Sequence, residues 1–372
     1  MTKPKRILVA CNHLKTVGGS ELYSYYLIKS LLEIGHHVEY FTFNGGIVSS
    51  KIELDLNVGF KSGNHYDLIL ASHQTTVNYL FGQGPILQIC HGPIPDLEQP
   101  SPLADFHISV SEEVATHLKG KGYTSTVILN GIDLEVLKPR RSLNKRPKKI
   151  LSLCQSSEAN ALIAGICEEE DLEFNFINKH TNPKFEISDE INGVDLVIGI
   201  GRSAYDAMAC GRPCILFDKR AYNGSMGDGY LYPSKFRNFS KHNCSGRYSK
   251  RSFTRRDLVN EIKKYNSDHG KELREIAIEE LNQRHVSREL VEIGNDISGW
   301  KHQKHYLKIF MNYYRFQEYF LYVKRSFRAK MKQEFYSGVS TKAIKEGIAK
   351  ENFILPLRLS LYLYWLQLKK IN

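Results

Sequence analysis

A glycine-rich turn before a short helix places several polar side chains where they could bind an anion. The segment Val194–Asp218 has the pattern of a buried strand, a turn, a helix and a second strand. Gly199 and Gly201 let the backbone turn sharply, and the helix is expected over Arg202–Cys210. The free N–H groups at the start of such a helix bind phosphate. Asp206, one turn into the helix, could then reach a ribose hydroxyl beside the phosphate.

The same turn fits two other interpretations. Gly199, Gly201 and Ala204 spell G-x-G-x-x-A, and Asp218 follows about where a dinucleotide-binding unit carries its ribose-binding acid. That motif belongs to the first strand of its domain, whereas this unit stands later in the chain. The simplest interpretation is a tight strand–helix turn with no ligand, which every α/β protein contains. The residues of this segment alone leave all three open.

Length and composition indicate a globular intracellular protein. The 372 residues are enough for two domains, or three, and a hydrophobic content of 42% is ample for their cores. Seven scattered cysteines suit a reducing cytosol, and no paired Cys/His cluster predicts a metal site. Neither a secretory signal nor an apolar run of the ~18 residues that span a membrane is visible. We therefore expect a cytoplasmic protein.

The expected elements follow one another as in two doubly wound domains. A strand over Arg6–Cys11, a helix over Leu22–Ile34 and a strand over Val38–Phe43 form an opening βαβ unit. The predicted divisions are an N-terminal Rossmann-like domain at 1–137, a basic linker at 138–149, a second Rossmann-like domain at 150–298 and a helical extension at 299–372. Residues 219–253 are rich in Gly, Ser, Tyr and Asn, and predict a long ordered loop beside the cleft between the domains.

Two places in the N-terminal domain could contact a ligand in that cleft. Gly18 and Gly19 stand in the first β–α loop, where ligands bind in doubly wound sheets. His91 ends a buried strand and is followed by Gly and Pro, so its side chain is expected to project into the cleft. His73 also ends a strand but lacks these neighbours, which makes it the poorer candidate. A hydrogen-bonded histidine at a strand end is the alternative for His91.

The segment GRSAYDAMACGRP resembles the nucleotide-binding segment of retaining family-4-type glycosyltransferases of the GT-B fold. In that family a Gly-rich turn leads into an acid and then Ala-Met-Ala-x-Gly-x-Pro. The resemblance implies that Gly201, Arg202 and Ser203 lie at the diphosphate of a nucleotide sugar and that Asp206 binds the ribose. It also implies two facing Rossmann-like domains, the second of which holds the nucleotide.

The N-terminal half carries weaker landmarks of the same family. The loop with Gly18, Gly19 and Glu21 resembles the one that borders the cleft on the acceptor side, and ISVSEEV and VILNGID, which includes Asn130, resemble the segments that close the N-terminal domain. The resemblance places His91 at the family's donor-facing histidine, beside the sugar or pyrophosphate. His91 is accordingly the predicted catalytic residue.

Two positions depart from the family pattern. The acid that contacts the donor sugar, eight positions before Asp206, is replaced by Ile198. The Gly-Arg pair and the lysine that grip the diphosphate are replaced by Gln155-Ser156-Ser157, so Gln155 and Ser156 become the predicted phosphate contacts and Arg202 is expected to supply the missing charge. No metal or other cofactor is expected, because the chain has no Asp-x-Asp triplet. The nearest pattern, at residues 53–56, predicts a half-exposed strand.

The net positive charge is concentrated at the end of the chain. Residues 300–372 contain 15 Lys/Arg and 4 Asp/Glu, interleaved with 16 aromatic residues. This segment could dock on an anionic membrane surface, at the inner face of the membrane, or form a helical annex with solvated charges. Nucleic acid is not an expected partner, since no recognised reader motif accompanies the charge.

Together these features and the resemblance predict a metal-independent hexosyltransferase that moves a sugar from a nucleoside-diphosphate sugar to a glycan or lipid-linked acceptor of a cell-surface polysaccharide. Retention of the anomeric configuration is implied by the resemblance alone. Two alternatives stay open. The two departures would suit a catalytically inactive binding protein, and a nucleotide-sugar epimerase can share the same two-domain fold.

Overall fold

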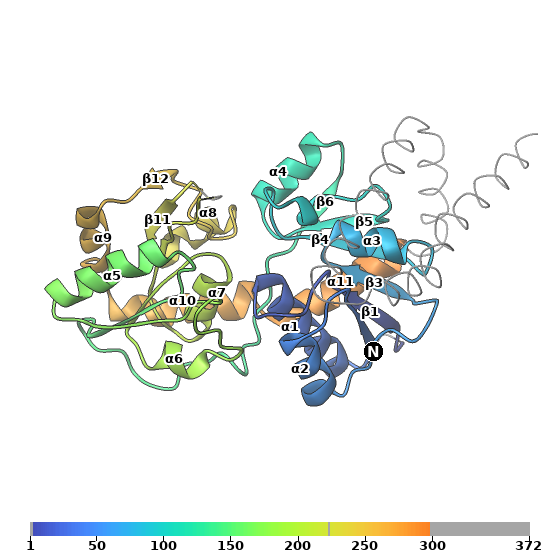
Figure 1. Cartoon of the computed structure of the whole chain (residues 1–372), viewed down its shortest axis with the longest axis horizontal. Helices are drawn as coiled ribbons and strands as arrows, with labels where there is room; N and C mark the ends of the chain where they lie inside the picture. Colours follow the sequence, from blue (N-terminus) through green and yellow to red (C-terminus); the bar gives the residue numbers. More distant parts are fainter. Residues whose placement is uncertain (1–2, 222–223, 298–372) are drawn as a thin grey trace, which may run out of the picture.

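The computed structural model describes residues 3–221 and 224–297, which form two lobes around two six-stranded sheets (Figure 1). We call them the N-terminal lobe and the C-terminal lobe. The predicted extension at 299–372, with its membrane-docking hypothesis, lies outside the described residues. None of the described helices has both the length and the apolar character needed to cross a bilayer.

The N-terminal lobe has an entirely parallel sheet in the order β2-β1-β3-β4-β5-β6. Its strands are β1 (Arg6–Ala10), β2 (His37–Phe41), β3 (Leu68–Ala71), β4 (Ile86–Cys90), β5 (Phe106–Ser109) and β6 (Ser125–Val127). Its helices are α1 (Gly19–Glu33), α2 (Ile47–Leu56), α3 (Gln74–Leu80), the 3-10 turn η1 (Asp96–Glu98) and α4 (Glu112–Gly120). Ser111 caps α4 by accepting a hydrogen bond from the N–H of Val114, as its position before the helix predicts.

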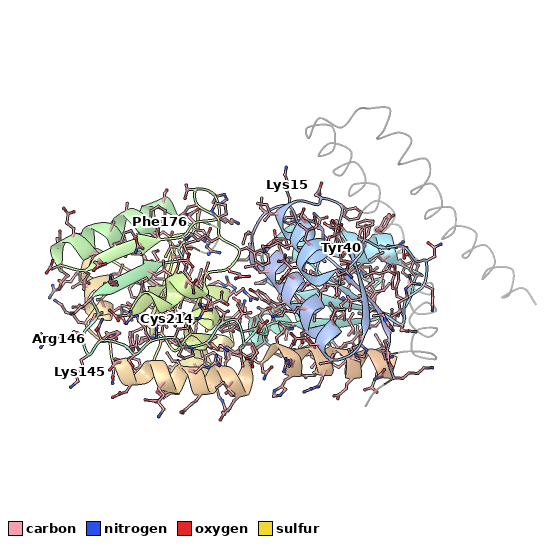
Figure 2. The ribbon with its side chains drawn as sticks, turned by 90° about the horizontal axis from the view of Figure 1, so that it is seen from below. Lys15, Tyr40, Lys145, Arg146, Phe176 and Cys214 are labelled. Carbon is pink, nitrogen blue, oxygen red and sulfur yellow. The ribbon has the colours of Figure 1, made fainter. Side chains whose placement is uncertain are left out.

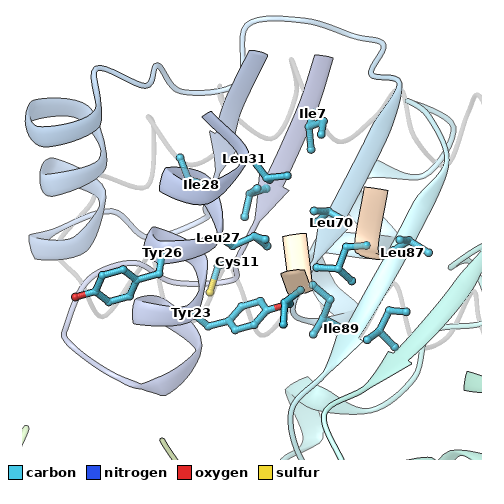
Figure 3. Packing of buried hydrophobic residues seen from close by; sticks show 14 of the residues in the cluster. Ile7, Cys11, Tyr23, Tyr26, Leu27, Ile28, Leu31, Leu70, Leu87 and Ile89 are labelled. Atoms are coloured by element: carbon cyan, nitrogen blue, oxygen red, sulfur yellow. The ribbon is translucent and has the colours of Figure 1, made fainter. Parts of the chain in front are cut away.

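Both faces of this sheet are buried, which explains the nearly continuous apolar strands in the sequence. Successive residues of β1 alternate between the faces: Ile7 packs in one core cluster and Leu8 in the other. Figure 3 shows the first cluster, where Leu27 and Leu31 of α1 pack toward Leu70 of β3.

The C-terminal lobe has the sheet order β12-β11-β10-β9-β7-β8, with two antiparallel strands at one edge. Its strands are β7 (Lys149–Ser152), β8 (Glu173–Phe176), β9 (Leu196–Ile198), β10 (Cys214–Phe217), β11 (Met226–Tyr230) and β12 (Arg251–Ser252). Its helices are α5 (Ser157–Glu169), α6 (Ser188–Asn192), α7 (Arg202–Ala209), the 3-10 turn η3 (Pro233–Lys235), α8 (Phe236–Ser240), α9 (Arg255–Ile262) and α10 (Ser267–Glu280). In Figure 2, Cys214 of β10 lies inside this lobe, while Lys145 and Arg146 project from its periphery.

The prediction of a long loop at 219–253 is wrong, because this segment contains β11, η3, α8 and β12. The glycines of β11 read as turn signals, but they serve close packing. A Cβ on Gly227 would lie 2.8 Å from the carbonyl oxygen of Leu216 on the neighbouring strand. Gly229 has a φ of +78°, which favours glycine.

Residues 53–56, predicted as a half-exposed strand, are the last turn of α2. Val48 and Ile52, four residues apart, are the buried face of this helix, and Leu54 on the opposite side is 82% exposed. The alternation of Glu, Leu, Asp and Leu is only four residues long, which is too short to distinguish the two-residue period of a strand from the 3.6-residue period of a helix.

The last described helix, α11 (Gln283–Ile297), belongs in sequence to the predicted second domain but packs on the N-terminal lobe. Val286 and Leu290 join the core cluster of α1, and Arg284 forms an ion pair with Glu33 at 2.9 Å. Helices α10 and α11 lie end to end beneath the two lobes (Figure 2). The chain therefore crosses between the lobes twice, and the junction of α10 and α11 restrains the position of one lobe relative to the other.

We expect the close packing of α11 to be visible in a substitution at Gly294. A Cβ there would lie 2.7 Å from a methyl group of the buried Leu68, so Gly294→Val should lower the free energy of unfolding by about 1–3 kcal/mol through overpacking. Gly120→Val in α4, where the added atoms meet open space, should change it by less than about 0.5 kcal/mol. Urea denaturation measures both, and equal midpoints would contradict the docking of α11 on Leu68.

Candidate functional site

The two sheets turn their topological switch points toward the same space. In the N-terminal lobe β1 and β3 are neighbours, but the chain continues from β1 toward one edge of the sheet and from β3 toward the other. In the C-terminal lobe the same reversal occurs between the neighbouring strands β7 and β9. Doubly wound sheets bind ligands beyond the carboxyl ends of such strands. The loops that follow these four strands line a cavity of about 520 Å³ between the lobes.

This cavity brings together the predicted site residues of both lobes, with one exception. It is lined by Gly18, Gly19, Glu21, His91 and Asn130 from the N-terminal lobe and by Gln155, Gly201, Arg202, Ser203 and Asp206 from the C-terminal lobe. His73 also lines it, whereas Ser156 does not. Their individual roles stay predictions.

The helix α7 begins at the cavity. Its N-cap residue, Gly201, has a φ of +62°, which a side chain would strain, and it supplies no side-chain acceptor to the helix. The N–H of Gly201 donates a hydrogen bond to the carbonyl oxygen of Cys244, at 2.8 Å. The N–H of Ala204 donates to the carbonyl oxygen of Gly201 at 3.0 Å, whereas the N–H groups of Arg202 and Ser203 precede the first intrahelical acceptor, and both residues line the cavity. The positive end of the helix is therefore open to a ligand.

Arg202 and Asp206 form a partly dehydrated pair one turn apart on α7. The Arg202 Nε lies 3.5 Å from the Asp206 Oδ1, and the guanidinium lies over the ring of Tyr26 at 5.0 Å, across the cavity edge. Asp206 is only 4% exposed, and its Oδ1 accepts no hydrogen bond from any described residue. Burial raises the pKa of Asp206 to about 6, although the charge of Arg202 opposes this. The pair is thus incompletely satisfied and faces the cavity.

The loop after β7 is tied to a buried carboxylate instead of offering its N–H groups to a ligand. Asp218, fully buried, accepts hydrogen bonds from the N–H groups of Gln155 and Ser156, at 3.0 and 3.2 Å, and from the Arg220 Nε at 2.6 Å. The Ser156 hydroxyl caps α5 by accepting from the N–H of Ala159. Since Asp218 is enclosed by these donors, it cannot bind a ribose, which removes the dinucleotide interpretation.

The departure at Ile198 also looks different in the structure. Its side chain is fully buried in a core cluster of the C-terminal lobe and does not line the cavity, which Ile200 reaches instead. The position of the family's sugar-binding acid is therefore part of the packing here.

On the opposite wall, the loop after β1 holds an oriented histidine. Glu21 is buried at the start of α1 and accepts hydrogen bonds from His13 Nε2 at 3.0 Å and from the Ser20 hydroxyl at 2.9 Å. The carboxylate folds back over Gly18, where a Cβ would come within 2.5 Å of it, so a larger residue at position 18 would displace the carboxylate. The bond to Glu21 raises the pKa of His13. Burial favours the neutral form of Glu21, but the hydrogen bonds from His13 and Ser20 and the charge of His13 together outweigh it, so the pKa of Glu21 is lowered.

Two further histidines of this wall are neutral. Burial lowers the pKa of His91 to about 4 and that of His73 to about 3. Because the His73 Nδ1 accepts from the N–H of Asn12 at 3.1 Å, its proton is on Nε2. His91 is half-buried, lies edge-on to the Tyr23 ring at 4.8 Å and has its Nε2 3.4 Å from the Ser72 hydroxyl. A neutral His91 can donate a hydrogen bond to a ligand but is a weak base.

The lobes contact one another at the rim of the cavity. Arg247 of the C-terminal lobe forms a two-pronged ion pair with Glu113 of α4, at 2.5 and 2.8 Å. The N–H of Glu113 donates to the carbonyl oxygen of Lys241, at 2.8 Å, and the Asn130 amide donates to Asn243 at 3.2 Å. Asn130 thus has a structural contact to the other lobe.

Five charged side chains that line this cavity were not found from the sequence, namely Glu98, Lys179, Lys184, Arg220 and Arg247, and two of them have no ion pair within the described residues. Ion pairs within the described residues account for Glu21, Lys184, Arg202, Asp206, Arg220 and Arg247. Glu98 of η1 and Lys179, after β8, also line the cavity, and no hydrogen bond or ion pair of either side chain occurs in the described part of the chain. Burial, followed by the charge of Glu21, raises the pKa of Glu98 to about 7. Glu98 belongs to the N-terminal lobe and Lys179 to the C-terminal lobe, so only the packing of the lobes shows that both side chains line the same cavity.

Comparisons with known proteins show the fold. Among solved structures, the chain is similar to a glycosyltransferase from Rickettsia africae ESF-5, with a TM-score of 0.51 and 13% identity over 79% of this chain and 98% of that one. It is also similar to an alpha-glucosyltransferase in complex with UDP-glucose and DNA containing an abasic site, with a TM-score of 0.50 and 10% identity over 79% of this chain and 100% of that one. Neither a protein-family model nor a curated protein sequence matches it. The fold is GT-B, as predicted.

The histidines of the cavity should titrate in an order set by their surroundings. We expect His91 and His73 to stay neutral between pH 8 and 5, because burial penalises their charged forms. His13, bonded to Glu21, should become protonated at a pH above its ordinary pKa of 6.5. Imidazole ¹³C shifts in an NMR titration measure this, with His13→Gln and His91→Gln variants to assign the signals. A midpoint near 6.5 for His91 would contradict its burial in the cleft wall.

Proposed function

We propose that this protein transfers a sugar from a nucleoside-diphosphate sugar to a hydroxyl acceptor. The observation that carries the proposal is the shared cavity: the open end of α7 faces a wall of neutral histidines and carboxyl groups from the other lobe. A leaving diphosphate needs positive potential where its charge develops, and a preformed helix end with nearby cations provides this. The GT-B fold of the structural neighbours supports the same chemistry, and both neighbours are described as glycosyltransferases.

The donor would bind along the C-terminal wall. The diphosphate would accept hydrogen bonds from the N–H groups of Arg202 and Ser203 at the start of α7. Lys179, which has no ion pair among the described residues, would supply positive charge. Asp206, whose Oδ1 accepts no hydrogen bond from a described residue, would accept one from a ribose hydroxyl. Gln155 lines the same wall, but its N–H binds Asp218, so its contribution would come from the side chain.

The finer features of the reaction follow from the same arrangement. A helix end and side-chain cations can neutralise the diphosphate without a metal ion, so we propose metal-independent transfer. A glycan or lipid-linked acceptor would enter from the N-terminal lobe, past Gly18 and Gly19, and His91 would donate a hydrogen bond to the sugar or the leaving group. One structural neighbour was solved with DNA, so the expectation that nucleic acid is no partner stays a prediction.

One observation favours a second candidate, an inactive relative that binds nucleotide sugars without turnover. The N–H groups of Gln155 and Ser156 donate to Asp218, so they are not available to a phosphate. The sugar-binding acid is replaced by the buried Ile198. In this case α7 would still bind the diphosphate.

A panel of UDP-, GDP-, ADP- and dTDP-sugars separates these functions. The full chain is incubated with each donor, with and without glycan and lipid-linked acceptors, and released nucleoside diphosphate is measured. Release that depends on an acceptor supports transfer, and release without one indicates hydrolysis or an epimerase. Binding without release indicates the inactive protein, and neither binding nor release would refute the proposal.

The cations of the donor wall should contribute unequally to binding. Lys179→Ala and Arg202→Ala should each weaken the binding of UDP, used as the probe, by about tenfold or more, through the loss of one charge-assisted contact. Lys184→Ala is the matched control, because Lys184 lines the cavity but is paired with Glu190 at 2.5 Å, and it should have a smaller effect. Calorimetric titration measures all three. Equal affinities for the wild type and Lys179→Ala would exclude Lys179 from the diphosphate site.

A further inference from the structure

We propose that Asn130 and Asn243 are positioning residues, which form a bridge across the cleft and hold His91 in place relative to the start of α7. Asn130 belongs to the N-terminal lobe and Asn243 to the C-terminal lobe, and both line the cavity. The inference rests on the proposed function, in which His91 contacts a donor bound at α7.

The bridge begins at the Asn130 side chain, whose two polar atoms have different partners. Its amide group donates to the Asn243 Oδ1 at 3.2 Å. Burial lowers the pKa of His91, and a side-chain hydrogen bond with Asn130 opposes this lowering. A bond that favours the charged ring is one in which the ring donates, so the Asn130 oxygen is the acceptor. With both ends of its amide engaged and only 8% of its surface exposed, Asn130 is held in one orientation.

The other end of the bridge is the turn that follows α8. The N–H of Cys244 donates back to the carbonyl oxygen of Phe239 in this helix, at 2.9 Å, which ends the helix and fixes the turn. The carbonyl oxygen of Cys244 in turn accepts the N–H of Gly201, the N-cap residue of α7, at 2.8 Å. One fixed turn thus contacts the start of α7 through its backbone and the other lobe through the Asn243 side chain.

Hydrogen bonds and one peptide link therefore join His91 to the end of α7 through the protein itself. The orientation of the His91 ring depends on the same turn that holds Gly201, so the ring and the helix end keep a constant spacing. This matters for transfer, because a misplacement of about 1 Å between reacting groups can lower a rate by on the order of a hundredfold.

The lobes do not need this bridge to stay in contact. The same segment, residues 241–247, also contacts α4, since the Lys241 carbonyl oxygen accepts the N–H of Glu113 and Arg247 forms an ion pair with Glu113. Lys241 forms a further, exposed ion pair with Glu112, at 3.5 Å. Removal of the Asn243 side chain should therefore leave the lobes together and change mainly the surroundings of His91.

The test uses three variants of the full chain. Asn243 has a φ of +53°, which Gly and Asp adopt more readily than most residues do. Asn243→Gly keeps the turn but removes the acceptor for Asn130, whereas Asn243→Asp keeps an oxygen at that place. Lys241→Ala is the matched control, because it removes an exposed contact between the lobes from the same segment, and Lys241 lies outside the cavity lining.

Asn243→Gly should lower kcat by about tenfold or more, while the affinity for UDP, used as the probe in calorimetry, stays at the wild-type value. Asn243→Asp and Lys241→Ala should keep the wild-type kcat. The donor is whichever of the UDP-, GDP-, ADP- and dTDP-sugars is turned over, with its acceptor, water included. In ¹³C NMR spectra, the imidazole signals of His91 should shift more in Asn243→Gly than in the other two variants.

The outcomes separate the bridge from simpler roles and from the proposed function. Unshifted His91 signals in Asn243→Gly would overturn the inference whatever the rate, and so would a wild-type kcat in this variant. An equal loss of kcat in Asn243→Asp would exclude the hydrogen bond as the cause, and a parallel loss of UDP affinity would mean that Asn243 only supports α7. If none of the nucleotide sugars is turned over, the proposed function fails, and the His91 signals alone decide whether the bridge exists.

Discussion

Charge pairing around the space between the lobes is the interaction on which the site depends. Charges removed from water are costly unless they are paired, and here the pairs also join the lobes at the rim, as Arg247 does with Glu113. Arg202 extends the same principle, since it lies between Asp206 of its own helix and the Tyr26 ring of the other lobe. A charge left unpaired in such a place has a free-energy cost that a ligand or a reaction can offset. Glu98 and Lys179, on opposite walls, are such charges.

The buried carboxylate of Asp218 explains why the donor wall departs from the family pattern. It binds the N–H groups of Gln155 and Ser156 and holds the guanidinium of Arg220, so the ends of β7 and β10 are joined through one side chain. A loop fixed in this way cannot also wrap a phosphate. In the proposed site, the positive charge for a phosphate would come from the start of α7 and from Lys179. The N–H of Lys179 donates to the side-chain oxygen of Gln155, which places Lys179 beside the same wall.

Much of the fold could be predicted from the sequence, because buried parallel strands and their helices have strong local patterns. The turn at Gly201 and the helix after it were predicted closely, because the glycine that permits the turn, the buried strand before it and the start of the helix all lie within a few residues of one another. What failed depended on distant partners. The glycines of β11 make room for Leu216, and only the packing of the two lobes places Glu98 in the same cavity as the start of α7, with no ion pair to another described residue. No local pattern carries that information.

The buried Ile198 bears on the chemistry as well as on the fold. An acid at that position would hold the donor sugar from the C-terminal wall, but here the side chain is in the core. Among the described residues that line the cavity, the carboxyl groups besides Asp206 are Glu21 and Glu98, and both belong to the N-terminal lobe. In the proposed site, a further carboxylate contact with the sugar would therefore come from the N-terminal lobe, while the diphosphate would bind at the start of α7 on the opposite wall. The loss of the acid at Ile198 would in this way separate the two kinds of contact, with cations and helix N–H groups on one lobe and the remaining carboxyl groups on the other.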